Sequence, residues 1–177
     1  LIVKIITQSK IIIMITFRNV VGFLETIADK HYEINSFHSG LLDEVDINKL
    51  GATDYVILYA EPGDATIDTG VMTYSFTIYV MDLINDQVLG DSPNNQRTTR
   101  VDAYSETLQI LHDVLNEFKH AMYSTSWVDD EIVLDTPISC EPFTAKFDNE
   151  LTGWSADVSV QVNNPNSLCI VPVDPNS

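Results

Sequence analysis

The chain has 177 residues and a formal net charge of -17, from 9 basic and 26 acidic side chains, although 45% of its residues are hydrophobic. This length fits one domain, and the apolar content excludes an acidic disordered chain, so the negative charge belongs to a folded surface. Such a surface repels phosphate, which excludes a protein that grips nucleic acid through a basic patch. The two cysteines, Cys140 and Cys169, are too few for a secreted disulfide scaffold and predict reduced cytoplasmic thiols.

The first residues, LIVKIITQSKIIIM, differ from the rest because they carry Lys4 and Lys10 and no acid. A polar run interrupts their apolar stretch, so they resemble neither a signal peptide nor a membrane span, which needs about 20 apolar residues. We expect residues 1–13 to be a non-native or flexible extension and residues 14–177 to form a single α/β domain. The alternative for the first segment is an added edge strand, Ile11 to Phe17, that pairs with a neighbouring subunit.

The first predicted helix begins at Thr16, a residue type that caps helices, and ends near His31. Its apolar stripe is Val20, Leu24, Ile27 and Ala28. A turn-rich connection or short strand follows, in which we expect Gly40 to take a positive φ.

Two strands are predicted next. Tyr55 to Ala60, YVILYA, is apolar on both faces, which is typical of a central strand. Val71 to Asp82 alternates between apolar and polar residues, and the turn formers from Pro62 to Gly70 predict a loop between the two strands. Together they should form a long hairpin, and the Val71 to Asp82 strand is expected to offer an exposed edge for assembly. The polar side of that strand contributes Thr73, Ser75 and Thr77 as candidate interface residues.

The segment from Asp86 to Arg100 has turn formers and no apolar period, and is expected to be a mobile loop. It places Arg97 and Arg100 on an otherwise acidic chain, so it is either a contact with an acidic neighbour or a solvated loop. The helix that follows is predicted over Tyr104 to Met122. Its apolar stripe is Tyr104, Leu108, Leu111, Leu115, Phe118 and Met122.

The C-terminal part predicts three strands: Ile132 to Leu134, Glu141 to Phe147 and Trp154 to Val162. In the last of them Trp154, Ala156, Val158, Val160 and Val162 share one face, while Ser155, Asp157, Ser159 and Gln161 share the other. Pro142 suits an edge strand or a bulge, because it lacks a backbone N–H. We expect Trp154 to be buried close to Phe143 or Phe118.

Motifs for chemistry are absent from the sequence, which has no phosphate loop, no G-x-G-x-x-G, no G-x-S-x-G, no H-E-x-x-H and no paired C-x-x-C. His31 and His38 with Asp43 and Glu44 can be drawn as a metal site, but their spacing favours surface or capping roles. Asp129-Asp130-Glu131 lacks the alternating ligands and the glycine of a calcium loop. We therefore expect no catalytic residue, no metal and no cofactor.

The order of several segments resembles uncharacterised structural proteins of tailed bacteriophages, of the tail-terminator or tail-completion kind. These segments are YVILYAEPGDATIDTGVMTYSFTIYVMDL, YSETLQILHDVLNEF, CEPFTAKFDNELTGWSADVSVQV and the final CIVP, and the resemblance covers about residues 14–172. It implies a ring that caps the tail tube and joins it to head-completion proteins, within a virion assembled from protein made in the host cytoplasm. It also implies a compact fold with a twisted sheet packed by two helices.

The sequence thus predicts an α+β single domain, in which two amphipathic helices cover the faces of a twisted, mostly antiparallel sheet. The expected function is a non-enzymatic ring component of the phage neck or tail end, without specific nucleic-acid or membrane binding. Its candidate assembly residues are Arg97, Arg100, Thr73, Ser75 and Thr77. The alternatives are a soluble adaptor and an enzyme whose acidic site is built from residues such as Asp129, Asp130 and His120.

Overall fold

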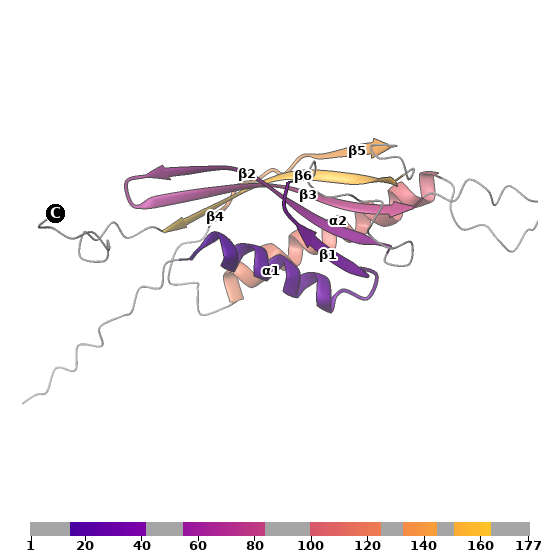
Figure 1. Ribbon diagram of the computed structural model, residues 1–177, viewed down its shortest axis with the longest axis horizontal. Helices are drawn as coiled ribbons and strands as arrows, with labels where there is room; N and C mark the ends of the chain where they lie inside the picture. The colour runs from indigo at the N-terminus through magenta and orange to yellow at the C-terminus, as the bar shows by residue number, and fades with distance from the viewer. Residues whose placement is uncertain (1–14, 42–54, 84–99, 125–132, 145–150, 164–177) are drawn as a thin grey trace, which may run out of the picture.

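A computed structural model describes residues 15–41, 55–83, 100–124, 133–144 and 151–163. Its elements in chain order are α1 (Phe17–Lys30), β1 (Ser36–Ser39), β2 (Ile57–Asp68), β3 (Val71–Leu83), α2 (Arg100–Ser124), β4 (Val133–Leu134), β5 (Cys140–Thr144) and β6 (Leu151–Asn163). The described strands form one sheet, and two helices accompany it (Figure 1). The predicted α+β fold class is confirmed.

The sheet has six strands in the order β1-β2-β3-β6-β4, and β5 also pairs with β6. Only β1 and β2 run parallel, and the other pairs are antiparallel. The long strands β3 and β6 form the centre, since they pair from Val71 opposite Asn163 to Leu83 opposite Leu151. β4 and β5 lie one after the other along the second edge of β6. Because β3 lies between β2 and β6, the expectation that Val71 to Asp82 offers an exposed edge is wrong.

Both helices lie on the same face of the sheet (Figure 1). The sequence analysis predicted that the helices cover the faces of the sheet and did not predict that they share one face. The reason is visible in β6, where Ala156, Val158, Val160 and Val162 are buried toward the helices. The alternate residues Ser155, Asp157, Ser159 and Gln161 point the other way and are polar. Since only one face is apolar along its full length, both apolar helix stripes are buried against that face.

Helix α1 begins and ends where the sequence predicted. The Thr16 side chain accepts a hydrogen bond from the Asn19 N–H at 3.3 Å, and the Asn19 side chain accepts one from the Thr16 N–H at 2.9 Å. This reciprocal cap satisfies two donors that a helix start otherwise leaves unpaired. The buried residues of α1 are Val20, Leu24, Ile27 and Ala28, as predicted, and His31 closes the helix. Ile15 and Thr16 lie outside any strand and Phe17 is helical, so a strand from Ile11 to Phe17 is wrong at this end.

The hairpin exists, but its predicted loop from Pro62 to Gly70 is wrong. Strand β2 continues through this segment to Asp68, and a two-residue turn, Thr69-Gly70, joins it to β3. Gly70 has φ +81°, which explains the glycine there. Between Pro62 and Ala65 the pairing shifts, because three steps along β2 match two along β3. Pro62 and Gly63 therefore belong to a bulge within a strand, a position where both residue types are common.

Helix α2 is longer than predicted, and its buried face matches the predicted stripe only in part: Leu111 and Phe118 are buried, and Tyr104 and Leu115 are half-buried. Leu108, predicted to lie in the core, is 37% exposed. The buried residues of α2 are Ala103, Thr107, Ile110, Leu111, Val114 and Phe118, and Leu115 is half-buried. Thr107 is fully buried, and its hydroxyl donates to the Ala103 carbonyl at 2.6 Å. A hydroxyl that is hydrogen-bonded within its own helix can be buried with little loss of stability. A search for apolar residues could not identify Thr107 as a core residue, because threonine is polar.

Trp154 is half-buried, not fully buried, and its partner is a residue that was not expected. Its ring lies edge-on to Tyr104 of α2 with centroids 6.0 Å apart, and its Nε1–H donates to the Tyr104 carbonyl at 2.9 Å. Phe143 instead contacts Tyr79, with ring centroids 5.8 Å apart. Trp154 therefore ties the central strand β6 to the first turns of α2.

A second apolar cluster lies on the face opposite the helices, at the end of the sheet where β2 begins. Its buried members are Ile57, Tyr59, Tyr79, Met81 and Leu151. Two aromatic contacts hold it together, Tyr59 with Tyr79 and Tyr79 with Phe143. The apolar character of YVILYA on both faces thus has a structural cause, because β2 contributes to both clusters.

Candidate functional site

The predicted interface residues of β3 lie side by side on the face of the sheet opposite the helices. Thr73 pairs with Gln161, Ser75 with Ser159 and Thr77 with Asp157, all half-buried or exposed. The Thr77 hydroxyl donates to Asp157 Oδ1 at 2.8 Å. These residues make a flat hydroxyl and carboxylate surface across β3 and β6, which we call the polar sheet face. Neither described helix covers this face, because both lie on the other side of the sheet (Figure 1).

The predicted arginines are not shown next to this face. Arg97 lies outside the described residues, and Arg100 is the first residue of α2, whose side chain is also not described. Of the five candidate assembly residues, the structure therefore brings together Thr73, Ser75 and Thr77.

The second exposed feature is the distal half of the hairpin. Residues Gly63 to Asp68 of β2 are all exposed, and Ile67 is 71% exposed. Strand β1 pairs with β2 only over Ile57 to Ala60. Past that point, none of the described strands pairs with this side of β2, so β2 is an edge strand there within the described sheet (Figure 1). The sequence predicted an edge in the hairpin but assigned it to the wrong strand.

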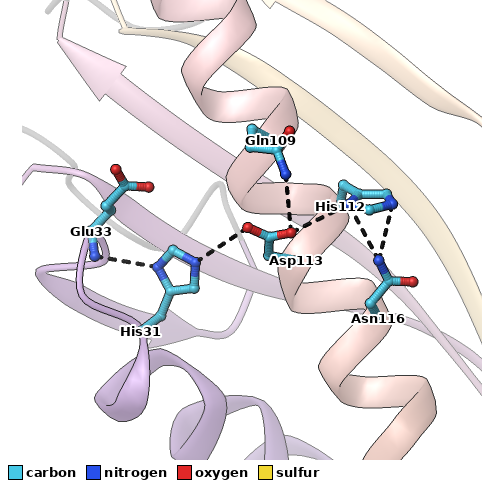
Figure 2. A network of polar contacts seen from close by, with 6 residues as sticks. All are labelled: His31, Glu33, Gln109, His112, Asp113 and Asn116. Atoms are coloured by element: carbon cyan, nitrogen blue, oxygen red, sulfur yellow. Dashed lines mark hydrogen bonds and ion pairs between the residues drawn. The ribbon is translucent and has the colours of Figure 1, made fainter.

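A polar network joins the end of α1 to the middle of α2 (Figure 2). His31 Nδ1 accepts a hydrogen bond from the Glu33 N–H at 3.3 Å, and His31 Nε2 lies 4.0 Å from Asp113 Oδ2. Asp113 Oδ1 also accepts from Gln109 Nε2 at 3.1 Å and lies 3.3 Å from His112 Nδ1. The Glu33 N–H thus occupies His31 Nδ1, and His31 Nε2 is the ring nitrogen that faces Asp113.

The network borders a surface cavity of about 890 Å³ between α1 and α2. Its lining residues are Phe23, Thr26, Ile27, Lys30, His31, Tyr32, Glu33, Asp113, Asn116 and Glu117. An acid-histidine pair needs a nucleophile or a substrate proton on its other nitrogen to do chemistry, and here that nitrogen is occupied by a backbone N–H. Thr26 supplies a hydroxyl to the lining of the same cavity, and this hydroxyl donates to the Gly22 carbonyl at 2.8 Å. The network therefore links the end of α1 to the middle of α2.

The histidines proposed as alternative metal ligands are not brought together. His31 contacts α2, while His38 lies on β1, and Asp43 and Glu44 lie outside the described residues. No group of three or more potential ligands occurs in the part of the chain that the structure describes. Asp129 and Asp130, the core of the enzymatic alternative, also fall outside it, and His120 is exposed on α2.

Among the residues that the structure describes, three ionisable side chains have perturbed pKa values. Burial raises the pKa of Tyr79, and its hydrogen bond to Glu61 Oε2, at 3.0 Å, raises it further because the acceptor is negatively charged. Burial also raises the pKa of Tyr74, whose hydroxyl donates to the Ile15 carbonyl at 3.3 Å. Burial raises the pKa of the Cys140 thiol, which is a free cysteine on β5. Each shift favours the neutral form, as in structural positions, and none creates a reactive anion at neutral pH.

Charge is distributed unevenly between the layers. The described strands carry no Lys or Arg. Their charged side chains are all acidic: Glu61, Asp64, Asp68, Asp82, Glu141 and Asp157. The two helices carry both signs: Arg18, Lys30, Arg100 and Lys119 lie on them beside Glu25, Asp29, Asp102, Glu106, Asp113 and Glu117. The strand layer therefore repels phosphate and acidic proteins, and attracts basic ones.

Neither the family models nor the curated proteins include one that matches this sequence. None of the described helices combines the length and the apolar character needed to cross a membrane.

Proposed function

We propose that this chain is a structural protein of the bacteriophage neck or tail end, which forms or joins a ring that terminates the tail tube and connects it to the head. Its partners are other copies of itself, tail-tube proteins and head-completion proteins. It has no catalytic activity and no cofactor, and it resides in the virion after synthesis in the host cytoplasm. The resemblance of residues 14–172 to such proteins is the starting point.

The observation that supports this function most is the unequal cover of the sheet. Two helices bury one face, while the polar sheet face with Thr73, Ser75 and Thr77 has no helix over it among the described elements (Figure 1). The hairpin adds an exposed edge next to that face. A sheet face and a strand edge that the described elements leave uncovered are the surfaces where contacts between copies and with partners would form.

The charge of the strand layer fits the same function. A tube through which a genome passes must not bind the DNA, and the acidic side chains of the strand layer repel phosphate. The formal net charge of -17 makes specific nucleic-acid binding by this chain unfavourable.

The test is charge reversal in the segment with the arginines. Arg97→Glu with Arg100→Glu should leave the chain folded but weaken its attachment to an acidic neighbour, with the larger loss at low salt, where charges are less screened. Arg18→Glu with Lys119→Glu is the matched control, because it also replaces two cations by two anions, at exposed positions on the helices. Electron microscopy of particles carrying each pair measures the outcome.

Particles of the first pair should lack joined tails or carry wrongly terminated ones, and particles of the control pair should be normal. Normal particles from both pairs would remove the role of Arg97 and Arg100. Absence of the unmodified protein from purified particles would contradict the proposed function itself.

A further inference from the structure

The surface cavity between the end of α1 and the middle of α2 has a lining of mixed chemistry. Phe23 and Ile27 supply apolar side chains, and Thr26, Tyr32 and Asn116 supply polar ones. The ionisable side chains of the lining are Lys30, His31, Glu33, Asp113 and Glu117. The volume of about 890 Å³ falls within the range of ligand pockets, roughly 300–1,000 Å³.

The charge of the lining selects the kind of group that it can hold. Three carboxylates stand against one ammonium, so the formal charge of the lining is -2 with His31 counted as neutral. The last turn of α1 borders the same space, and the carbonyl end of a helix favours cations. The cavity therefore attracts a cation and repels phosphate and carboxylate groups.

Two of the three carboxylates are available to such a cation. Asp113 already accepts from Gln109 Nε2 at 3.1 Å and faces His31 Nε2 at 4.0 Å (Figure 2). The Glu33 and Glu117 side chains are exposed and make no hydrogen bond or ion pair with another described residue. Glu33 follows α1 and Glu117 belongs to α2, so two anionic groups border the space from different elements.

An organic cation with an apolar stem fits this lining better than a metal ion. No group of three or more potential metal ligands occurs among the described residues. Phe23 and Ile27 instead form an apolar wall beside the carboxylates, and the Phe23 ring packs on Phe118 with centroids 5.7 Å apart. Among protein side chains, arginine combines an apolar stem with five N–H donors in a planar fork, which two carboxylates can accept together.

The rim of the cavity favours a guanidinium over an ammonium group. Tyr32 is 101% exposed and directly precedes Glu33. A guanidinium plane stacks on an aromatic ring and is less strongly hydrated than an ammonium. Exposed carboxylates hold a free cation only weakly, because little of its lost freedom is offset. A side chain within a protein segment brings neighbouring contacts with it, so a partner protein is a better source of the cation than a free amine.

We propose that the cavity between α1 and α2 receives an arginine side chain of a partner protein, from a segment in which an apolar residue adjoins the arginine. The guanidinium lies between Glu33 and Glu117 and against Tyr32, and the apolar neighbour contacts Phe23 and Ile27. Because both helices lie on the side of the sheet away from the polar sheet face, this contact is separate from that face (Figure 1). It does not depend on the proposed function.

Binding of a short peptide to the intact protein tests the site. The probe is acetyl-Gly-Leu-Arg-Gly-amide, titrated at millimolar concentration and low salt by isothermal calorimetry. A matched peptide carries citrulline in place of arginine, which keeps the shape of the side chain and removes its charge. The arginine peptide should bind saturably at one site per chain, and the citrulline peptide should bind at least about tenfold more weakly, because it lacks charge-assisted hydrogen bonds.

Substitutions in the lining locate the binding. Glu33→Gln with Glu117→Gln should raise the dissociation constant of the arginine peptide at least about tenfold. Tyr32→Ala should raise it about two- to fivefold, through loss of the stacking. All three positions are exposed, so these variants should remain folded, which circular dichroism checks. Glu25→Gln with Asp29→Asn is the matched control, because it removes two charges at exposed positions of α1 outside the lining and should leave the dissociation constant within about twofold.

Four results would overturn the proposal. The first is the absence of saturable binding by the arginine peptide, and the second is equal binding by the citrulline peptide. The third is an equal loss of affinity in the lining variants and in the control, which would show attraction to the acidic chain as a whole. The fourth is binding of the corresponding lysine peptide as tight as that of the arginine peptide, which would exclude recognition of a guanidinium.

Discussion

Gly153→Ala tests the register of the central strands, because this glycine lies where three strands meet. Gly153 pairs with Met81 of β3 on one side and with Phe143 of β5 on the other. A Cβ atom at this position would lie 1.9 Å from the carbonyl oxygen of Val80, about 1.5 Å short of the ordinary contact distance of 3.4 Å. The obstacle is backbone within paired strands, so no side-chain rotation relieves it.

The expected cost follows from that geometry. Overpacking an interior costs about 1–3 kcal/mol when flexible neighbours share the strain. Since the obstacle here is backbone, we expect Gly153→Ala to lower the free energy of unfolding by about 3 kcal/mol or more, equivalent to a fall in Tm of roughly 6–12 °C for a domain of this size. Gly22→Ala is the control, because nothing lies within 4 Å of its Cβ position in α1. That change should stabilise the protein by about 0.5–1 kcal/mol, since alanine favours a helix.

Urea unfolding followed by circular dichroism measures both variants, with the slope of the transition checked for constancy. The result that would refute the reasoning is a Gly153→Ala midpoint within about 0.5 kcal/mol of the parent while Gly22→Ala behaves as expected. In that case the close approach of β6 to β3 at Val80 does not exist.

Three further predictions concern single contacts. Trp154→Phe should keep the ring packing on Tyr104 but lose the Nε1–H hydrogen bond, which lowers the free energy of unfolding by about 1 kcal/mol. Trp154→Ala should lower it by about 3 kcal/mol. Equal losses for the two variants in urea unfolding would show that the hydrogen bond, and not the ring packing, dominates. Asp113→Asn should change the free energy of unfolding by less than about 1 kcal/mol, because its 4.0 Å pair with His31 is partly exposed. A larger loss would show that the polar network between the helices contributes more to stability than this contact implies. In a Cys169→Ser background, the rate of alkylation of Cys140 at pH 8 should be lower than that of a free thiol and should increase only at higher pH. The reason is that burial raises the pKa of the Cys140 thiol and only the thiolate reacts. Alkylation as fast as that of glutathione would contradict that burial.

The elements predicted well from the sequence are those whose signals are local. Helix α1 has its cap, its stripe and its end within sixteen residues, and Thr16, Val20 and Leu24 occupy the predicted places. Strand β6 likewise follows from alternation, because one face of it is apolar from Trp154 to Val162. In both cases the period of the apolar residues agrees with the surface that they bury.

The errors occur where tertiary contacts override local chemistry. Pro62 and Gly63 are turn formers in any local assessment, but here they form a bulge, because pairing with β3 continues past them on both sides. In α2, apolar residues occur on more than one side of the helix, so the pattern alone did not reveal that Ile110 would face the sheet and Leu108 would not. The exposed face depends on how the helix is placed against β3 and β6, which no local pattern encodes.

The candidate site was predictable only in part, for the same reason. The polar alternation of β3 identified Thr73, Ser75 and Thr77, which do share one face of the sheet. The contact between His31 and Asp113 joins residues far apart in the sequence and has no local signal. The open edge belongs to β2 because β1 is short, and the sequence left that segment as either a connection or a short strand.

The location and copy number of this protein in purified phage particles test the central claim most directly. Quantitative mass spectrometry against a tail-tube protein, combined with electron microscopy of particles carrying a tagged copy, gives both quantities. The proposed function predicts a small, fixed number of copies per particle, consistent with one ring, with the tag at the junction between the tail and the head. Particles that lack the protein, or that contain it in amounts varying from one preparation to the next, would contradict it.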